Sequence, residues 1–181
     1  MPDSTLVANH YTHGNLVDAL QQGIQSLGKT TGTIDINDLG PVDEFHIGGR
    51  IATESFLDQL DIGSSHHVLD VGCGIGGASR FAADRYGCRV TGVDLTQEYV
   101  DTGNVICSWL GLDDRISLQT ENAMHLPHPD NTFDRAYMLH VISTMASIGL
   151  ANFQVLKEPV QPINHHLNQL KQTRGNFWSV K

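Results

Sequence analysis

Two stretches in the first third of the chain place apolar side chains at helical spacing. The first predicts a helix over residues 14–27, with Gly28 as a C-terminal cap, and its apolar positions are Leu16, Leu20, Ile24 and Leu27. The second lies between Gly48 and Gly63 and carries Ala52, Phe56 and Leu60. Residues 29–41, between the two, are rich in Thr, Gly and Asp and are predicted to be a loop.

From residue 66 the pattern changes to short apolar runs separated by amphipathic segments. The predicted strands cover residues 67–71, 89–94, 115–119 and 133–140. Helices are predicted over residues 77–86 and 99–110, each followed by a glycine. The segment 123–132 is predicted to be a loop because Pro127 and Pro129 prevent a regular helix. Strands that alternate with helices of this length indicate an α/β fold with a parallel sheet.

The pattern ends near residue 141, where the charge balance also changes. Residues 1–140 carry 7 basic and 19 acidic side chains, whereas residues 141–181 carry 4 basic and 1 acidic. No convincing fifth strand follows. We therefore divide the chain into an N-terminal helical cap segment (1–63), a core (64–141) and an atypical C-terminal tail (142–181). The hypothesis for this tail is truncation, a frame change or alternative splicing.

Composition limits the classes of function. A chain of 181 residues is long enough for one domain. Its net charge of −9 argues against nucleic-acid binding, because an acidic surface repels phosphate backbones. It has no apolar run near the roughly 20 residues of a membrane span and no recognisable signal peptide. The three cysteines do not form a disulfide framework, so a cytoplasmic protein with reduced thiols is expected.

The strongest chemical signal is a glycine-rich loop between the first strand and its helix. Gly72, Gly74, Gly76 and Gly77 follow the run Val68-Leu-Asp-Val, in the strand–loop–helix context of a nucleotide-binding site. Asp94 ends the second strand 22 residues after Gly72, the spacing at which an acid binds ribose hydroxyls. The alternatives are a ligand-free turn and, for Asp94, an acid that favours a helix N-terminus.

Asp70 distinguishes between the possible nucleotides. It precedes the first glycine by two residues, where a carboxylate would oppose the pyrophosphate of NAD. It suits a ligand that carries an ammonium and a sulfonium. An NAD-dependent oxidoreductase is the alternative that this position argues against.

Four segments, in order, resemble class I S-adenosylmethionine-dependent methyltransferases. Residues 69–77 resemble the first motif of that family, residues 90–94 the motif whose acid holds the ribose, residues 121–134 the adenine segment, and residues 137–141 the end of the fourth strand. Residues 42–50 resemble the type-11 group of small-molecule methyltransferases. The resemblance implies a Rossmann-like parallel sheet with N-terminal helices, limited here to the 3-2-1-4 portion of a seven-stranded fold.

The resemblance also implies the site. Asp70 and the backbone of Gly72, Gly74 and Gly76 would meet the methionine part of the cofactor. Asp94 would bind the ribose, with Leu95 beside the adenine. The adenine edge would meet Asn122, where the family often has Asp, and Ala123.

The implied reaction is direct methyl transfer from S-adenosylmethionine to a nitrogen, oxygen or carbon of a small molecule. Positioning and the exclusion of water supply much of the acceleration of such a displacement. A base is needed only for a protonated nucleophile. His140 and His46 are the candidates for it. Tyr11 and Tyr137 are candidates for orienting a substrate, and all four residues have packing or capping as the alternative.

Two further expectations concern metals and partners. The ten histidines lack zinc-type partners, so no metal site is expected. A fourth strand without a neighbour would be an apolar sheet edge, and such edges recruit other chains, so self-association through it is predicted. A cofactor-binding remnant without catalysis is a third hypothesis beside the methyltransferase and the oxidoreductase.

Overall fold

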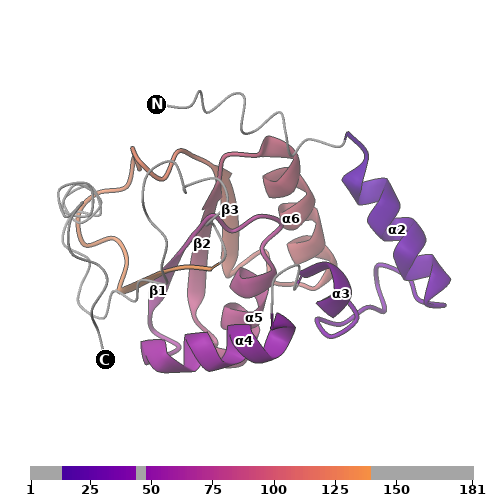
Figure 1. Ribbon diagram of the computed structural model, residues 1–181, viewed down its shortest axis with the longest axis horizontal. Coiled ribbons are helices and arrows are strands. Elements are labelled where there is room, and N and C mark those ends of the chain that lie inside the picture. Colours follow the sequence, from indigo (N-terminus) through magenta and orange to yellow (C-terminus); the bar gives the residue numbers. More distant parts are fainter. Residues whose placement is uncertain (1–13, 44–47, 140–181) are drawn as a thin grey trace.

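A four-stranded parallel sheet forms the centre of the computed structural model, which describes residues 14–43 and 48–139. The spatial order of its strands is β3-β2-β1-β4, which confirms the predicted 3-2-1-4 arrangement. Figure 1 shows the sheet with its helices beside it. The strands are β1 (His67–Val71), β2 (Arg89–Asp94), β3 (Ile116–Thr120) and β4 (Arg135–Met138).

The predicted helices are present within a few residues of their expected ends. The helical elements are α2 (Leu16–Ser26), α3 (Gly40–Asp43), α4 (Gly49–Leu57), η1 (Asp58–Leu60), α5 (Gly77–Tyr86) and α6 (Gln97–Trp109). The short helix α3 begins at the end of the stretch that was predicted to be loop. β4 is shorter than predicted: Asp134 precedes it and uses its N–H and its carboxylate to bind the backbone of His67.

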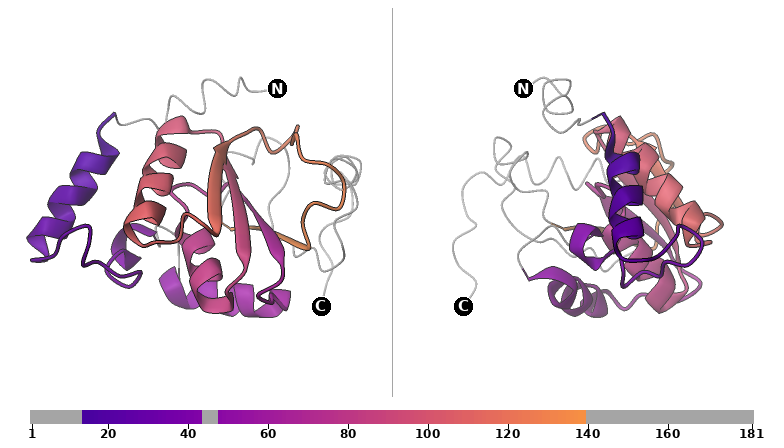
Figure 2. Two further views of the ribbon diagram at one scale, coloured as in Figure 1. Left: turned by 180° about the vertical axis from the view of Figure 1, so that it is seen from behind. Right: turned by 90° about the vertical axis from the view of Figure 1, so that its right-hand side faces the viewer.

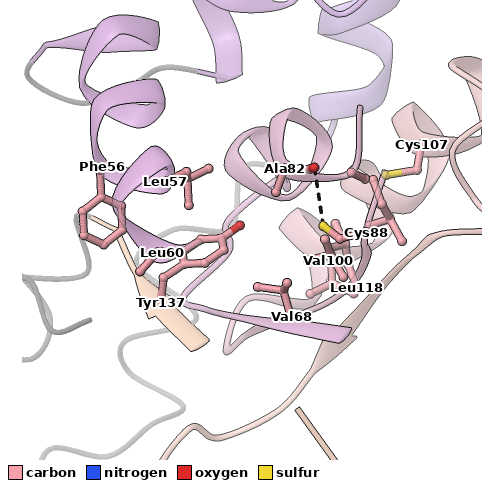
Figure 3. Packing of buried hydrophobic residues seen from close by; sticks show 13 residues of the cluster. Phe56, Leu57, Leu60, Val68, Ala82, Cys88, Val100, Cys107, Leu118 and Tyr137 are labelled. Atoms are coloured by element: carbon pink, nitrogen blue, oxygen red, sulfur yellow. Dashed lines mark hydrogen bonds between the residues drawn. The ribbon is translucent and has the colours of Figure 1, made fainter. Parts of the chain in front are cut away.

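One face of the sheet packs against helices. Val68 of β1, Val90 of β2 and Tyr137 of β4 share a buried cluster with Phe56 and Leu57 of α4. Figure 3 shows Tyr137 beside Phe56 and Leu60, with Cys88 donating a hydrogen bond to the carbonyl of Ala82. The cluster explains why apolar runs alternate with helices in the sequence: the four strands and the helices α4, α5 and α6 each contribute a buried side.

The opposite face packs against the loop over residues 121–134. Leu69 of β1 and Val93 of β2 contact the loop residues Leu126 and Phe133 in a second buried cluster. The imidazole of His67 packs at a tilt against Phe133, with ring centroids 4.7 Å apart. Burial on both faces is typical of parallel sheets and accounts for the apolar side chains that β1 places on each face of the sheet.

Residues 14–43, which form the described N-terminal segment, pack on α6 and α5, and both views in Figure 2 show α2 beside α6. Leu20 and Ile24 of α2 and Leu39 bury their side chains against Ile106 of α6. Ile75, in the loop that follows β1, packs against the same cluster. The N-terminal segment therefore contacts the glycine loop through the side chain of Ile75.

Some predicted features lie outside the described residues. These are Tyr11, His46, His140 and the tail from residue 142. Within the described part of the chain, no helix combines the length and the apolar character needed to cross a membrane.

Candidate functional site

The glycine loop connects the carboxyl end of β1 to the N-terminus of α5. Gly72, Gly74 and Gly76 have φ values of 74°, 55° and 84°, a region that L-residues with a Cβ rarely adopt. β1 lies between β2 and β4. The strands β2 and β3 lie on one side of β1 and β4 lies on the other, so the strand order reverses direction at β1. Ligands of open α/β sheets bind at such a switch point, at the carboxyl ends of the strands.

The loop is fastened to the end of β2 by its backbone N–H groups. Gly72 and Cys73 both donate to the carbonyl of Val93, at 2.8 and 3.1 Å. Gly74 donates to Oδ2 of Asp94 at 3.0 Å, and Oδ1 of Asp94 accepts the N–H of Thr96 at 2.9 Å. Asp94 thus shapes the loop and the start of α6, and it keeps part of its surface exposed.

The two inner glycines of the loop differ in their surroundings. A Cβ on Gly74 would meet no atom within 4 Å, whereas one on Gly76 would lie 2.7 Å from Leu118. Gly76 is therefore favoured by its φ of 84°, and the close approach of Leu118 of β3 adds to this preference. Gly74 faces open space, so a ligand can approach the main chain there.

The predicted adenine segment reaches the same edge of the sheet. The N–H of Glu121 donates to the carbonyl of Asp94 at 2.9 Å, which brings Asn122 and Ala123 to the end of β2. Asn122 is exposed and accepts the N–H of Met124 through Oδ1 at 2.9 Å. Ala123 is buried in the cluster on the second face of the sheet, and Leu95 is partly exposed. The structure thus brings the predicted cofactor residues from three strands together.

Asp70 lies at this edge but points beneath α5. Its side chain is 1% exposed and accepts hydrogen bonds from the hydroxyls of Ser79 at 2.6 Å and Tyr137 at 3.0 Å. Burial raises the pKa of Asp70 to about 6, although both hydroxyls oppose this rise and favour the ionised form. The carboxylate is therefore held by three elements, β1, α5 and β4.

Tyr137 and Cys73 are packing residues. Tyr137 is 1% exposed and its hydroxyl is bound to Asp70, so the packing alternative applies rather than a contact with substrate. Burial raises the pKa of the Cys73 thiol well above its usual range. A thiol that stays protonated is a poor nucleophile, and Cys73 packs against the buried cluster on the helix-covered face of the sheet.

Arg80 is a buried residue of the site that the sequence analysis missed. It lies in α5 and is 0% exposed. Its guanidinium donates to the carbonyl of Ile75 at 2.6 Å and forms an ion pair with Asp43 of α3. Burial opposes the charge of Arg80, but the Asp43 carboxylate outweighs burial and raises its pKa. The signal that could have found it is the spacing of Gly77, Arg80 and Ala83, which places Arg80 on a stripe of small buried residues.

The charges at the loop favour a cationic ligand. The nearby Asp94 carboxylate adds to the rise in the pKa of Asp70, and the buried cation Arg80 is paired with Asp43. Four loop N–H groups already donate to protein acceptors, which leaves them unsuited to a pyrophosphate. These residues fit a nucleoside that carries a positive charge at its far end.

Among the described residues, no group of three or more His, Cys, Asp or Glu side chains is arranged to hold a metal ion. His128 instead pairs with Glu121 at 3.0 Å and packs its ring edge against Phe133. This contact fixes the loop over the second face of the sheet.

Residues 68–158 match the family model described as "Methyltransferase domain". The methyltransferase GfsG of Streptomyces halstedii is 33% identical over 102 residues, 56% of this chain and 37% of that protein. A probable chloroplastic tocopherol O-methyltransferase of Oryza sativa subsp. japonica is 40% identical over 72 residues, 40% of this chain and 20% of that protein.

The chain therefore spans about a third or less of the length of these two curated relatives. A solved structure with a similar fold is that of the 4+2 cyclase SpnF. It has a TM-score of 0.53 at 22% sequence identity and covers 75% of this chain and 48% of its own. This likeness supports the fold.

Proposed function

The chain belongs to the methyltransferase domain family, and from this premise we propose that it binds S-adenosylmethionine and transfers its methyl group to a small molecule. The observation that carries the proposal is the contact between the glycine loop and Asp94. Gly74 and Asp94 join the ends of β1 and β2 through a hydrogen bond of 3.0 Å. This contact forms one wall of a ligand site at the switch point of the sheet.

Each of the predicted residues has a role in this proposal. The partly exposed Asp94 would accept hydrogen bonds from the ribose hydroxyls. The backbone of Gly72, Gly74 and Gly76 would lie along the methionine part. The adenine would lie near Leu95, Asn122 and Ala123. Because Oδ1 of Asn122 already accepts the N–H of Met124, its NH₂ group is the part that would meet the adenine.

We assign Asp70 an electrostatic role. Its carboxylate is buried beneath the loop, so it acts on a bound cation through its field and through the shape of the loop. This field is strong because the surroundings screen it poorly. A direct contact between Asp70 and the cofactor stays a prediction.

The bound cofactor would supply an electrophilic methyl group on a positively charged sulfur. The protein then needs to align the acceptor atom with the methyl group and to exclude water. A protonated acceptor also needs a base. His140 and His46, both outside the described residues, are the bases that we propose. A nitrogen, oxygen or carbon acceptor is compatible with this chemistry.

Titration with S-adenosylmethionine, followed by calorimetry, tests the cofactor. We expect saturable binding to the full chain and binding at least about tenfold weaker in Asp94→Asn, since one charge-assisted hydrogen bond is lost. Asp101→Asn is the matched control, because Asp101 is an exposed acid of α6 that pairs with Gln97. An absence of binding to the unsubstituted chain would remove the proposal.

Turnover is tested separately. Radiolabelled cofactor is incubated with a panel of amine, phenol and sterol acceptors, and methylated products are identified by mass spectrometry. Product formation supports the transferase. Binding without turnover on any acceptor supports the cofactor-binding remnant instead. Enhanced nicotinamide fluorescence with NADH would favour the oxidoreductase, for which the comparisons give no support.

We also propose self-association through β4. β4 is the last strand of the described sheet and pairs with β1. Size-exclusion chromatography with light scattering tests this proposal: a dimer or larger species supports it, and a monomer at all concentrations opposes it. A cytoplasmic location stays a prediction.

A further inference from the structure

The buried ion pair between Arg80 and Asp43 joins the N-terminal segment to the glycine loop. Both side chains are 0% exposed. Nε of Arg80 also donates to Oδ2 of Asp43 at 3.3 Å, so the pair is bidentate. Bidentate pairs fix geometry as well as charge, and Asp43 is the final residue of α3.

Arg80 also holds the loop itself. Its NH1 donates to the carbonyl of Ile75 at 2.6 Å. This carbonyl lies against α6, where a Cβ on Gly103 would come within 2.6 Å of it. The Ile75 carbonyl is thus clamped between Arg80 and Gly103, directly before the positive-φ residue Gly76.

The N-terminal segment makes two further contacts with the same region. The backbone of Asp43 passes so close to α5 that a Cβ on Gly77 would lie 2.5 Å from the Asp43 carbonyl oxygen. The Ile75 side chain packs into the cluster built by Leu20, Ile24 and Leu39. Loop and N-terminal segment therefore share both a polar and an apolar contact.

We propose that Arg80 is a positioning residue for the cofactor: with Asp43 as its counter-ion, it fixes the Ile75 carbonyl and so holds the glycine loop in its ligand-binding shape. This inference rests on the proposed function. It makes cofactor affinity depend on the N-terminal segment, although Arg80 itself lies beneath the loop. By linkage, cofactor binding then stabilises the contact between α3 and α5.

Four variants of the full chain separate positioning from plain stability. Arg80→Met and Asp43→Asn each leave one buried charge unpaired, and such variants are expected to lose stability. The double variant Asp43→Leu with Arg80→Met replaces the pair by apolar groups, which restores stability in comparable cases. The double variant still lacks a donor for Ile75. Arg80→Lys keeps a charge and a donor.

Two readouts accompany the melting temperature of each variant: the Kd for S-adenosylmethionine and the hydrogen exchange of the amides of residues 72–77 without ligand. We expect the double variant to melt near the original temperature but to bind about tenfold more weakly and to exchange faster in the loop. Arg80→Lys should recover part of the affinity. Arg85→Ala is the control, because Arg85 lies in the same helix and forms an exposed pair with Glu54.

The outcomes keep the two proposals apart. If the double variant recovers both its melting temperature and its cofactor affinity, Arg80 is a structural residue only and the inference is overturned. If the unsubstituted chain does not bind S-adenosylmethionine, the proposed function fails. In that case the hydrogen exchange of the amides of residues 72–77 tests whether Arg80 holds the loop. Faster exchange in the double variant supports the inference, and unchanged exchange refutes it.

Discussion

The buried carboxyl group of Asp70 lowers the stability of the fold at neutral pH, although it has a proposed electrostatic role in the site. Its carboxyl group is buried and its pKa is raised to about 6 by that burial. The folded chain therefore binds this proton more tightly than the unfolded chain does. The free energy of unfolding contributed by Asp70 is greatest below its unfolded pKa near 3.8 and declines as the pH rises through about 6.

Asp70→Asn is expected to raise the free energy of unfolding at pH 7 by about 1–3 kcal/mol, since one pKa unit corresponds to about 1.4 kcal/mol. It should also remove the loss of stability between pH 4 and 6 that this group causes. Urea unfolding across that pH range, with Asp101→Asn as control, measures both effects. An unchanged pH slope in Asp70→Asn would contradict the assignment. The same variant should bind the cofactor more weakly, because the negative field is lost.

Among the elements, α6 supports both the loop and the edge of the sheet. Its Gly103 allows the close approach of the Ile75 carbonyl. Its Asn104 accepts the N–H of Leu118 at 3.1 Å and donates to the Leu118 carbonyl at 2.9 Å. The side-chain amide thus occupies backbone groups of β3, which is one way to protect an edge strand.

Gly103→Ala and Gly23→Ala should have opposite effects, although both replace a helical glycine. In α6 the added methyl group overpacks against the Ile75 carbonyl, with an expected loss of about 1–3 kcal/mol. In α2 a Cβ on Gly23 meets nothing within 4 Å, so the higher helix propensity of Ala should add about 0.5–1 kcal/mol. Chemical denaturation compares the two, and a gain in Gly103→Ala would contradict the close packing.

The elements were largely predictable because their signals are local. Apolar runs and glycine stops gave the four strands and the helices α2, α5 and α6, and the loop glycines with Asp94 gave the outline of the site. The pairing of Arg80 with Asp43 was not predictable, since the two residues are 37 positions apart, and the stripe of small residues in α5 indicates that Arg80 is buried but not which residue it pairs with. The burial of Asp70 likewise depends on Ser79 and Tyr137, whose packing no local pattern indicates.

At the scale of the molecule, the described fold is one sheet with two unequal coverings. Helices pack on one face, and the loop over residues 121–134 packs on the other. The candidate site lies at the edge where β1, β2 and the start of that loop meet. A ligand bound there contacts segments that are distant in sequence, so it links them in the folded state.

Cofactor binding should therefore raise the melting temperature of the whole fold. At a concentration 100 times its Kd, a ligand that binds only the folded state adds about 2.7 kcal/mol, or roughly 5–10 °C for a chain of this size. Differential scanning fluorimetry measures this shift, with Asp94→Asn as the weaker-binding comparison. A shift confined to the second half of the chain in hydrogen exchange would contradict the link to the N-terminal segment.

The three cysteine thiols differ in burial, so their labelling rates can report how different parts of the fold open. Cys88 and Cys107 are 0% exposed, and burial raises the pKa of both, to about 11 for Cys88. Only the thiolate reacts with an alkylating reagent, so the two buried cysteines are labelled at the rate at which the helix-covered core opens. Cys73 is partly exposed, so it is expected to be labelled first. Peptide mapping after timed alkylation would measure the three labelling rates in one experiment on the protein without substitutions.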